Sequence, residues 1–230
     1  MRHAPAIKRR RDMRGSCATA RQMSDIRPKT RIGEANVERI LDAGLTVFSR
    51  FGLHGARTDQ IAETAGMSKP NLLYYFRTKE DLYVAVLTRT LDMWLEPLAG
   101  IDPAADPGEA LSAYIARKLE FSRDYPDQSR LFAMEVIQGA GLLNEALKRA
   151  LAPLVEAKIA TLTAWIAAGR LAPVDPLTLL FTIWATTQHF ADFGAQATVL
   201  SNRSLDDPAH FRATLAAIIE IVLKGVLPRA

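Results

Sequence analysis

The sequence predicts an all-α fold, with an N-terminal three-helix domain of the helix-turn-helix type followed by a larger helical domain. Apolar residues recur at the three- and four-residue spacing of amphipathic helices through most of the 230 residues. No segment alternates apolar and polar residues for long enough to form a strand. Residues 56–80 contain two short helical patterns separated by a glycine, which is typical of a helix-turn-helix. We expect an arm over residues 1–33, the helix-turn-helix domain over 34–94 and the second helical domain over 95–230.

The first residues form a basic segment without helical periodicity. Residues 1–31 contain ten Lys or Arg and two acidic residues, a balance of +8, and because the whole chain carries +4, the remainder carries −4. Such a segment is expected to be disordered in isolation. A basic arm ahead of a DNA-binding domain can neutralise phosphates or enter the minor groove. The alternative is a solvated leader without a role, and Met13 or Met23 is an alternative start.

Glycines and polar caps set the expected limits of the first two helices. A helix from about Glu34 to Phe51 follows the amphipathic rhythm, and Gly52 should end it because glycine readily adopts the left-handed conformation. Thr58 is expected to cap a short helix over residues 58–65 through its hydroxyl. Gly66 then makes the turn.

The next two helices begin with similar signals. Ser68 should cap a helix over residues 69–76, and Pro70 lies in its first turn, where a missing N–H costs nothing. Thr78 should cap a fourth helix that continues without a break to residue 99. Within residues 69–76 we expect Leu72, Leu73 and Phe76 to be buried and at least one tyrosine to lie outside.

Polar side chains gather at the open ends of these helices, where DNA would approach. Lys69 and Asn71, beside the cap Ser68, are the candidates for reading base edges. Phosphate contacts are expected at helix starts and from phenol hydroxyls, and Arg57 fits either class. The full set of candidate DNA contacts is Arg57, Thr58, Ser68, Lys69, Asn71, Tyr74, Tyr75 and Lys79. The alternative is two ordinary helices of a helical protein, with the tyrosines in its core.

The remaining two thirds of the chain also predict helices. They are expected over residues 108–124, from Pro126 to 137, over 142–168 with a kink or break at Pro153, over 176–199 and over 208–223. The last helix has an apolar stripe wide enough for two neighbours. A stripe of this width favours a second subunit as one of those neighbours.

Two groups of residues resemble those of a known family. Residues 58–69, TDQIAETAGMSK, and 73–82, LYYFRTKEDL, resemble the N-terminal domain of TetR-type transcriptional regulators, over about residues 34–94. Four later runs are similar to a subgroup of this family that regulates pyrimidine utilisation: FSRFGLHG from residue 48, SRDYP from 122, LAPVDP from 171 and IWATTQHFADF from 183. Pro70 departs from the family pattern, in which many members have a small or polar residue, so no base contact is expected there.

The resemblance implies a function as well as a fold. It implies a homodimer, paired through the last two helices in a four-helix bundle, that binds a double-stranded and palindromic operator. A small-molecule effector, uracil or thymine in this subgroup, would release the protein from DNA. The protein would most simply be a repressor of pyrimidine-utilisation genes. A regulator of the same family with a different effector, such as a cationic drug or an acyl-CoA, is the alternative.

Polar residues on the apolar helix over 176–199 suggest where an effector would bind. Trp184 and Gln188 are four residues apart and share a helix face. An indole can stack on a planar ring, and a carboxamide offers donors beside an acceptor, which matches the edge of a pyrimidine-dione. Trp94 and Lys118 are weaker candidates for the same pocket. The alternative is that Trp184 belongs to the core and that Gln188 bonds a buried backbone group or faces a dimer partner.

An enzyme acting on a small planar substrate is the more distant alternative. The four histidines are scattered, no Cys/His cluster has metal-ligand spacing, and neither a phosphate-binding glycine loop nor a nucleophile elbow is present. We therefore expect no catalytic residue, no metal site and no cofactor.

Cys17 is the single cysteine, which fits a reducing cytoplasm. No apolar run is expected to span a membrane, so we expect a cytoplasmic protein. Glu135 and Asp192 are the carboxylates that a cationic effector would need.

Overall fold

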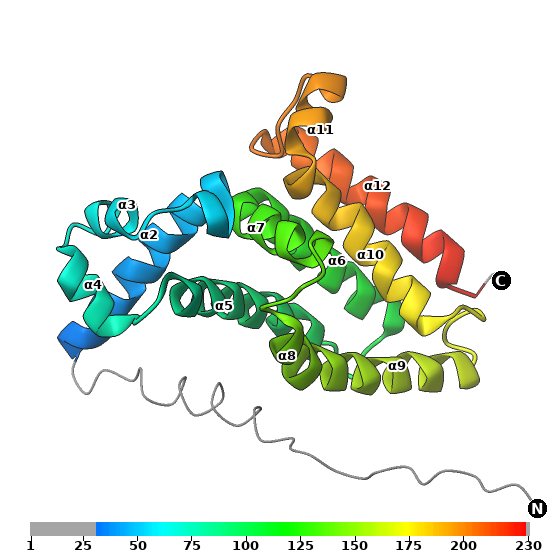
Figure 1. The fold of residues 1–230 in the computed structure, drawn as a ribbon. Helices are drawn as coiled ribbons and strands as arrows, with labels where there is room; N and C mark the ends of the chain where they lie inside the picture. Colours follow the sequence, from blue (N-terminus) through cyan, green and yellow to red (C-terminus); the bar gives the residue numbers. More distant parts are fainter. Residues whose placement is uncertain (1–30, 229–230) are drawn as a thin grey trace, which may run out of the picture.

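Helices make up all the regular secondary structure of residues 31–228, which are the residues that the computed structural model describes (Figure 1). The expected all-α fold class is confirmed. Most of the expected arm, and Cys17 with it, lies outside the described residues. The elements are α2 (Arg31–Gly55), α3 (Thr58–Thr64), α4 (Lys69–Tyr75), α5 (Lys79–Ala99), α6 (Pro107–Asp124), α7 (Pro126–Ile137), α8 (Asn144–Ala146), η2 (Leu147–Leu151), α9 (Ala152–Ala167), α10 (Pro176–Asp192), α11 (Gly194–Ser201) and α12 (Pro208–Val226).

The capping residues of α4 and α5 are those that the sequence predicts. Ser68 has extended backbone angles, and its hydroxyl accepts a hydrogen bond from the Asn71 N–H at 3.4 Å. Thr78 accepts from the Asp81 N–H at 3.0 Å, while the Asp81 carboxylate accepts from the Thr78 N–H at 3.1 Å. This reciprocal pair satisfies two donors that a helix start leaves free. The caps fix where α4 and α5 begin.

One prediction about the start of the domain is confirmed and one is wrong. Gly52 interrupts the first helix as expected, because its backbone is not helical (φ 63°, ψ −178°), and a short helical turn follows to Gly55. Thr58 is not a cap, because the chain is still extended at Arg57 and Thr58 is the first helical residue of α3. Gln60 takes over the capping role, since its side-chain oxygen accepts the Arg57 N–H at 3.1 Å.

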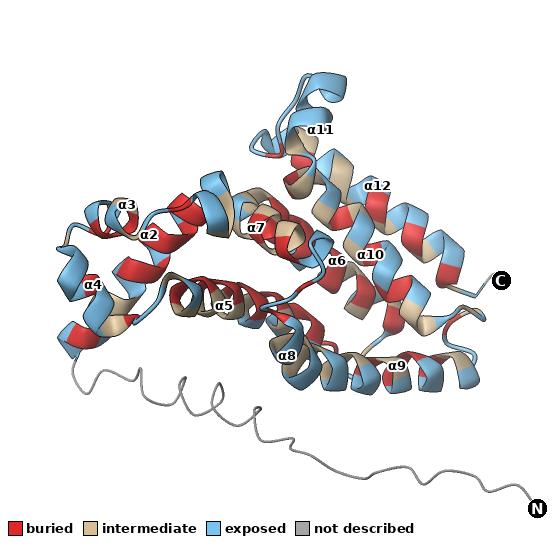
Figure 2. Ribbon diagram, viewed as in Figure 1, coloured by how far each residue is buried: buried red, intermediate tan, exposed pale blue. Residues whose placement is uncertain are grey.

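Burial within α4 differs from the prediction at one position. Leu72 and Phe76 are buried, as expected, and they lie four residues apart on the face that packs against the domain. Leu73 is 36% exposed, so the expectation that it is buried is wrong. Because successive helical residues are about 100° apart, the residue after Leu72 is turned away from that face. The short α4 therefore exposes most of its surface (Figure 2).

The later helices differ from the prediction in where they are interrupted. The stretch over 142–168 contains the π-helical turn η2, which ends two residues before Pro153, and the backbone angles are helical at both ends of this turn. Proline has no N–H to continue the regular ladder, and the π turn is the irregularity beside it, but the helix is not divided at Pro153, which lies inside α9. The helix expected over 176–199 is not continuous, because α10 ends at Asp192 and α11 begins at Gly194. Glycine is a poor helix former, which favours an end at this point.

Within residues 31–228 the buried apolar side chains form two clusters, one towards each end of the described structure. The first joins α2, α3, α4 and the start of α5, around Phe48, Leu72 and Leu82, and it also contains Leu131 of α7. The second lies where α6 packs against α10 and α12, with α9 beside them. Figure 1 shows α3 and α4 at one end of the molecule and α9, α10 and α12 at the other. Because Leu131 comes from beyond residue 94, the first cluster depends on the second part of the chain.

Helix α5 connects the two clusters and is held at both ends. Lys79 donates from Nζ to the Ala56 carbonyl at 2.9 Å, which ties its start to the loop between α2 and α3. Lys158 of α9 donates to the carbonyls of Ala99 and Ile101 at 3.0 and 2.8 Å, which satisfies acceptors at its end. A positive charge at a helix C-terminus also interacts favourably with the helix dipole. Movement of α5 is therefore communicated to both domains.

Within residues 31–228, one helical stretch is long and apolar enough to cross a membrane. By length and composition alone, the expectation that no stretch could do so was wrong. The stretch covers Asn144–Ala167, with a mean hydropathy of 1.3 in its most apolar window. Length and composition alone are a weak argument, because core helices of other proteins meet the same test. Lys158 and Trp165 within this stretch are buried against the loop that follows α5.

Replacement of Leu131 tests whether α7 completes the first cluster. Leu131→Ala should lower the free energy of unfolding by about 2–5 kcal/mol, because it leaves a cavity in a fully buried site. Ile137→Ala is the matched control, since Ile137 lies on the same helix and is exposed. Chemical denaturation followed by circular dichroism measures both. Equal stability of the two variants would contradict the role of Leu131.

Candidate nucleic-acid interface and ligand pocket

The turn between α3 and α4 leaves the start of α4 open to solvent. Gly66 has a φ of 64°, and the Met67 N–H donates to the Ala62 carbonyl at 3.0 Å, which closes the turn. Glycine adopts this left-handed conformation without a steric penalty. Ser68, Lys69 and Asn71 are all exposed. These three side chains can therefore meet a ligand without any movement of the backbone.

Lys69 is paired with an acidic residue of the preceding helix. Its Nζ lies 3.1 Å from Oδ2 of Asp59, and both side chains are about half exposed or more. Exposed ion pairs of this kind contribute little to stability. Lys69 can exchange Asp59 for a phosphate or a base edge at low cost. The sequence-based analysis did not identify Asp59, because only the packing of α3 against α4 brings the pair together.

Tyr75 is held in place by the first helix of the domain. Asn36 of α2 donates from Nδ2 to the Tyr75 hydroxyl oxygen at 2.8 Å, and Arg39 donates to the Asn36 side-chain oxygen at 3.2 Å. The Tyr75 hydroxyl oxygen acts as an acceptor here, so its proton remains available for another acceptor. Tyr74 is 81% exposed and packs edge-on against Tyr75. Sequence reasoning missed Asn36 and Arg39. Asn36 and its partner Tyr75 are 39 residues apart in the chain, so no local pattern links them.

The remaining predicted contacts lie together at two helix starts. Arg57 is exposed and Thr58 is half-buried at the beginning of α3. The bond from Lys79 to the Ala56 carbonyl brings the start of α5 beside them. One ammonium hydrogen of Lys79 is used in this bond and two remain, so the residue has a structural role in addition to the predicted one. All eight predicted DNA contacts thus belong to one end of the molecule.

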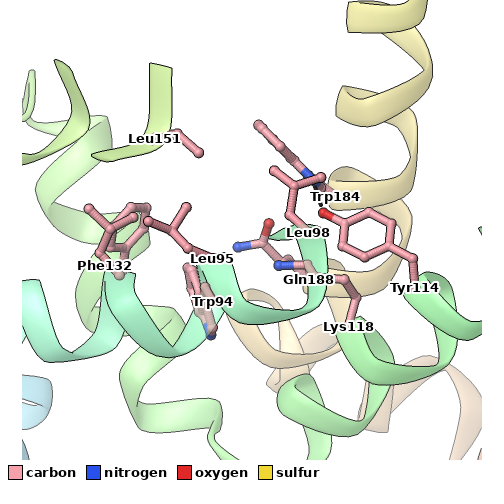
Figure 3. A pocket seen from close by; sticks show the side chains of 10 residues that line it. Trp94, Leu95, Leu98, Tyr114, Lys118, Phe132, Leu151, Trp184 and Gln188 are labelled. Atoms are coloured by element: carbon pink, nitrogen blue, oxygen red, sulfur yellow. Dashed lines mark hydrogen bonds between the residues drawn. The ribbon is translucent and has the colours of Figure 1, made fainter. Parts of the chain in front are cut away.

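The four predicted ligand residues surround a single cavity of about 70 Å³ (Figure 3). Its walls come from α5, α6 and α10, with one residue each from α7 and η2. The lining residues are Leu91, Trp94, Leu95, Leu98, Tyr114, Lys118, Phe132, Leu151, Trp184 and Gln188. One water needs roughly 10–15 Å³ of such space, so the cavity has room for about five waters. It is an apolar space with few polar groups, as small-molecule sites usually are.

Lys118 brings a positive charge into this apolar space. It is 4% exposed, and its Nζ lies 4.8 Å from the centroid of the Trp94 ring, a cation–π contact. Burial lowers the pKa of Lys118 to about 8, and the charge of Asp192 opposes this shift. Lys118 remains mostly protonated at neutral pH. It offers donors and no acceptor to anything in the cavity.

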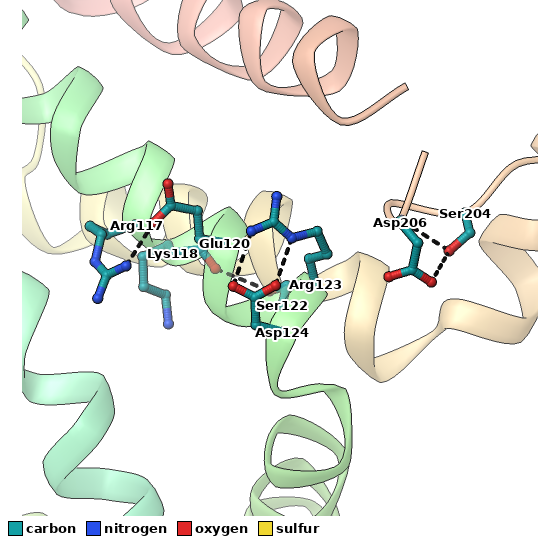
Figure 4. A network of polar contacts seen from close by, with 8 residues as sticks. All are labelled: Arg117, Lys118, Glu120, Ser122, Arg123, Asp124, Ser204 and Asp206. Atoms are coloured by element: carbon teal, nitrogen blue, oxygen red, sulfur yellow. Dashed lines mark hydrogen bonds and ion pairs between the residues drawn. The ribbon is translucent and has the colours of Figure 1, made fainter. Parts of the chain in front are cut away.

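Figure 4 shows four other charged residues of α6 joined in pairs. Arg117 pairs with Glu120 at 2.7 Å, and Arg123 pairs with Asp124 at 2.6 Å. These pairs are partly or largely exposed and contribute little energy. Arg123 also lines a second cavity, of about 140 Å³, whose lining contains none of the predicted ligand residues. Lys118 is therefore set apart from the other charges of α6 by its burial.

Tyr114 is the polar residue of this lining that sequence reasoning missed. Its hydroxyl oxygen accepts a hydrogen bond from Nε1 of Trp184 at 2.6 Å (Figure 3). Burial raises the pKa of Tyr114, and the bond from Trp184 opposes this effect, so the hydroxyl stays protonated. Tyr114 lies four residues before Lys118 and shares its helix face. That spacing was the available signal, but the position also fitted the apolar stripe of this helix.

The two carboxylates expected for a cationic effector do not line the cavity. Glu135 is buried and accepts from the Tyr83 hydroxyl at 3.2 Å and from the Leu142 N–H at 3.0 Å. Asp192 is half-buried and accepts from the Ser129 hydroxyl. Burial raises the pKa of Asp192, while the Ser129 bond and the charge of Lys118 lower it. Both carboxylates are engaged by the protein itself.

Cavity and DNA-binding domain share structural elements. Trp94 on α5 lines the cavity, and Leu82 on the same helix lies in the first apolar cluster. On α7, Phe132 lines the cavity, while its neighbour Leu131 is buried in that cluster. The rings of Trp94 and Phe132 are 4.8 Å apart and meet edge-on. A ligand in the cavity would therefore contact α5 and α7, the helices that pack against α3 and α4 in the first cluster.

Both parts of the chain match known protein families. Residues 40–86 match the bacterial regulatory proteins of the tetR family, and residues 87–229 match the C-terminal region of YcdC-like protein. The HTH-type transcriptional regulator RutR of Escherichia coli is 47% identical over 201 residues, which cover 87% of this chain and 95% of that protein. The HTH-type transcriptional repressor SCO4008 of Streptomyces coelicolor is 32% identical over 103 residues, 44% of this chain and 50% of the repressor.

Solved structures agree with this assignment. The transcriptional regulator SCO4942 of Streptomyces coelicolor superposes with a TM-score of 0.66 and 29% identity, over 84% of this chain and 98% of its own. FadR of Bacillus subtilis, solved with stearoyl-CoA, has a TM-score of 0.62 and 19% identity over 82% and 98%, and this likeness shows the fold alone. The chain thus belongs to the TetR family of bacterial regulatory proteins, and it is a DNA-binding transcriptional regulator and not an enzyme.

Proposed function

We propose that this regulator binds a palindromic operator as a homodimer in the cytoplasm and that uracil or thymine releases it from DNA. While it is bound to the operator, the protein acts as a repressor of pyrimidine-utilisation genes. The observation that carries the effector proposal is the small cavity lined by Trp94, Lys118, Trp184 and Gln188. The resemblance of the chain to pyrimidine regulators supports the same conclusion.

Cavity size and lining favour a single polar ring over the other effectors considered. A space for about five waters suits one small ring and is too small for a long acyl chain. A cationic drug would meet Lys118 and no carboxylate in this lining. A flat neutral ring can lie against the indoles, and its carbonyl oxygens can accept from Lys118 and Gln188. The amide oxygen of Gln188 can in turn accept from a ring N–H.

On the DNA side, α4 is the helix that enters the major groove. Lys69 and Asn71 then meet base edges, while Tyr75 and Lys79 contact phosphates together with Arg57, Thr58, Ser68 and Tyr74. Helix-turn-helix dimers read two half-sites about 34–36 Å apart, and a two-fold axis in the protein requires a palindromic site.

Exposed apolar residues of the last helices support pairing of two copies. The large apolar side chains that are at least half exposed there are Phe181, Phe193, Val199, Leu200 and Ile221. Side chains of this kind are normally covered by a partner when they gather on one region. Pairing through α10 and α12 holds the two α4 helices at a fixed separation. A small rotation of either domain changes that separation.

Release follows from differential binding of the effector to two arrangements of the helices. An effector between Trp94 and Trp184 separates α5 from α10 and presses on Phe132 of α7. Because α5 and α7 also form part of the first apolar cluster, the DNA-binding domains tilt. The effector shifts this equilibrium only by the difference in its affinity for the two arrangements.

Titration with pyrimidines tests the proposal as a whole. Operator fragments selected from random duplexes, followed by fluorescence anisotropy, give the affinity with and without ligand. Saturating uracil or thymine should weaken operator binding at least tenfold. Gln188→Leu should bind the operator normally and lose most of this response. Unchanged operator affinity in saturating uracil would contradict the effector assignment.

Removal of the Tyr75 hydroxyl tests a phosphate contact. Tyr75→Phe should weaken binding to operator and to unrelated duplexes by a similar factor, about three- to tenfold, because it removes about 1 kcal/mol of hydrogen bonding. Tyr125→Phe is the control. This exposed tyrosine caps the C-terminus of α6 and lies far from α4 in the sequence. A loss confined to the operator would instead make Tyr75 a base-reading residue.

Replacement of Lys118 should stabilise the protein and weaken its response. The folded-state pKa of about 8 is below the ordinary value of 10.5, so between these pH values the unfolded chain holds a proton that the folded chain has lost. Burial of the charged Lys118 lowers the free energy of unfolding by up to about 3 kcal/mol at pH 7. This penalty is relieved as the pH rises from 8 to 10.5, so the free energy of unfolding increases over that range. Lys118→Met should raise the free energy of unfolding at pH 7, flatten its rise above pH 8 and weaken uracil binding.

Denaturation at pH 7 and pH 10, with calorimetry for uracil, measures these effects. Lys148→Met serves as the control because Lys148 is exposed. A Lys118→Met variant that is less stable at pH 7 than the unmodified chain would show that the charge is compensated in the free protein.

A further inference from the structure

We propose that Asp59 helps to select the operator sequence. Its carboxylate accepts a hydrogen bond from the amino group of a cytosine, while its ion-pair partner Lys69 donates to the guanine of the same base pair. The inference rests on the docking of α4 in the major groove proposed above, and it adds α3 to the elements that read sequence. The target is one C·G pair in each half-site, in one orientation.

The ion pair between Lys69 and Asp59 carries this inference, because it presents a donor and an acceptor side by side. Nζ of Lys69 and Oδ2 of Asp59 are 3.1 Å apart, and the two side chains are 48% and 64% exposed. The bond uses one of the three ammonium hydrogens. Within residues 31–228 no group donates to the other carboxylate oxygen. Both partners therefore keep hydrogen-bonding capacity for a ligand that approaches from solvent.

A C·G pair offers the complementary arrangement in the major groove. The cytosine amino group N4 is a donor, and guanine O6 and N7 are acceptors. Because N4 and O6 are hydrogen-bonded to each other in the base pair, they are about 2.9 Å apart. This spacing is close to the 3.1 Å between Nζ of Lys69 and Oδ2 of Asp59. The ion pair can therefore stay intact, with the carboxylate over the amino group and the ammonium over O6 and N7.

The other three base pairs fit this arrangement less well. G·C and T·A place a base oxygen against the carboxylate and an amino group against the ammonium, so both contacts are repulsive. A·T keeps an amino group beside an oxygen, but adenine N7 then lies next to the carboxylate. The thymine methyl group also replaces the second acceptor that guanine offers to the ammonium. Discrimination thus comes from repulsion by the wrong pairs as well as attraction by the right one.

The carboxylate of Asp59 also opposes binding to unrelated DNA. Duplex phosphates attract cations and repel an exposed carboxylate, so Asp59 lowers the attraction that Lys69 exerts on any duplex. Glu63 provides a matched comparison, since it is exposed and lies four residues later on the same face of α3. Its side chain has no hydrogen-bond or ion-pair partner within residues 31–228. Glu63 therefore supplies the same charge without a lysine beside it.

Binding of the full chain to a panel of duplexes tests the role of Asp59. The preferred half-site is selected from random duplexes, each position is changed to the other three base pairs, and affinities are measured by fluorescence anisotropy at one salt concentration. The unmodified protein should prefer C·G at least tenfold at one position. Asp59→Ala should reduce this preference to about threefold or less and leave the other positions unchanged. Lys69→Met should narrow the preference at the same position. Glu63→Gln should strengthen binding to unrelated duplexes, as Asp59→Ala does, and keep every base preference.

The outcomes separate this inference from the proposed function. If the unmodified protein binds a preferred duplex and Asp59→Ala keeps every base preference, or weakens all of them alike, the role of Asp59 is refuted while the operator-binding regulator stands. If no duplex is preferred, operator binding itself is refuted, and the inference with it.

Modified DNA tests the same contact on the unmodified chain, in case Asp59→Ala fails to fold. A methyl group on N4 of the selected cytosine leaves base pairing in place and removes the amino hydrogen that faces the groove. This methylation should weaken binding at least tenfold, because the carboxylate loses its donor. Methylation of a cytosine at another position of the half-site is the control. Equal affinity for the duplexes with and without the methyl group at the selected position would overturn the inference.

Discussion

The continuity of α5 is the constraint on which the rest of this protein depends. This single helix begins at the Thr78 cap beside the DNA-binding elements and ends at Ala99, where Lys158 bonds the carbonyls of Ala99 and Ile101. Its first half is buried in one apolar cluster and Leu98 in the other. A rigid helix fixed in two cores cannot move at one end alone. Ligand binding near Trp94 and the position of α4 are thereby linked through one element.

Helix α7 makes this link tighter than a single connecting helix would. Adjacent residues Leu131 and Phe132 face the first cluster and the cavity respectively. Near them, Glu135 joins α7 to α5 through the Tyr83 hydroxyl, and a buried carboxylate with two donors is costly to rearrange. Against this rigid side, the cavity itself contains the costly charge of Lys118. The protein thus combines a firm connection with a pocket whose polar groups await a partner.

Local signals predicted much of the fold and part of the site. Ser68 and Thr78 were recognisable as caps because the residue type and the following turn suffice. The prediction failed at Thr58, where Gln60 caps from within the helix, and at Leu73, whose exposure depends on which face of α4 packs. The four ligand candidates do share one cavity, although their role remains a prediction. Tyr114 escaped notice, since a core tyrosine and a pocket tyrosine look the same in an apolar stripe.

By itself the sequence determined the all-α class, the helix-turn-helix and the family, because helical periodicity, caps and turns are set within a few residues of one another. Only the tertiary structure decided that Asn36 holds Tyr75, that Asp59 pairs with Lys69 and that Trp184 bonds Tyr114. These partners are 10 to 70 residues apart. Such contacts depend on how helices pack against each other, and packing is a property of the whole chain that no short pattern records.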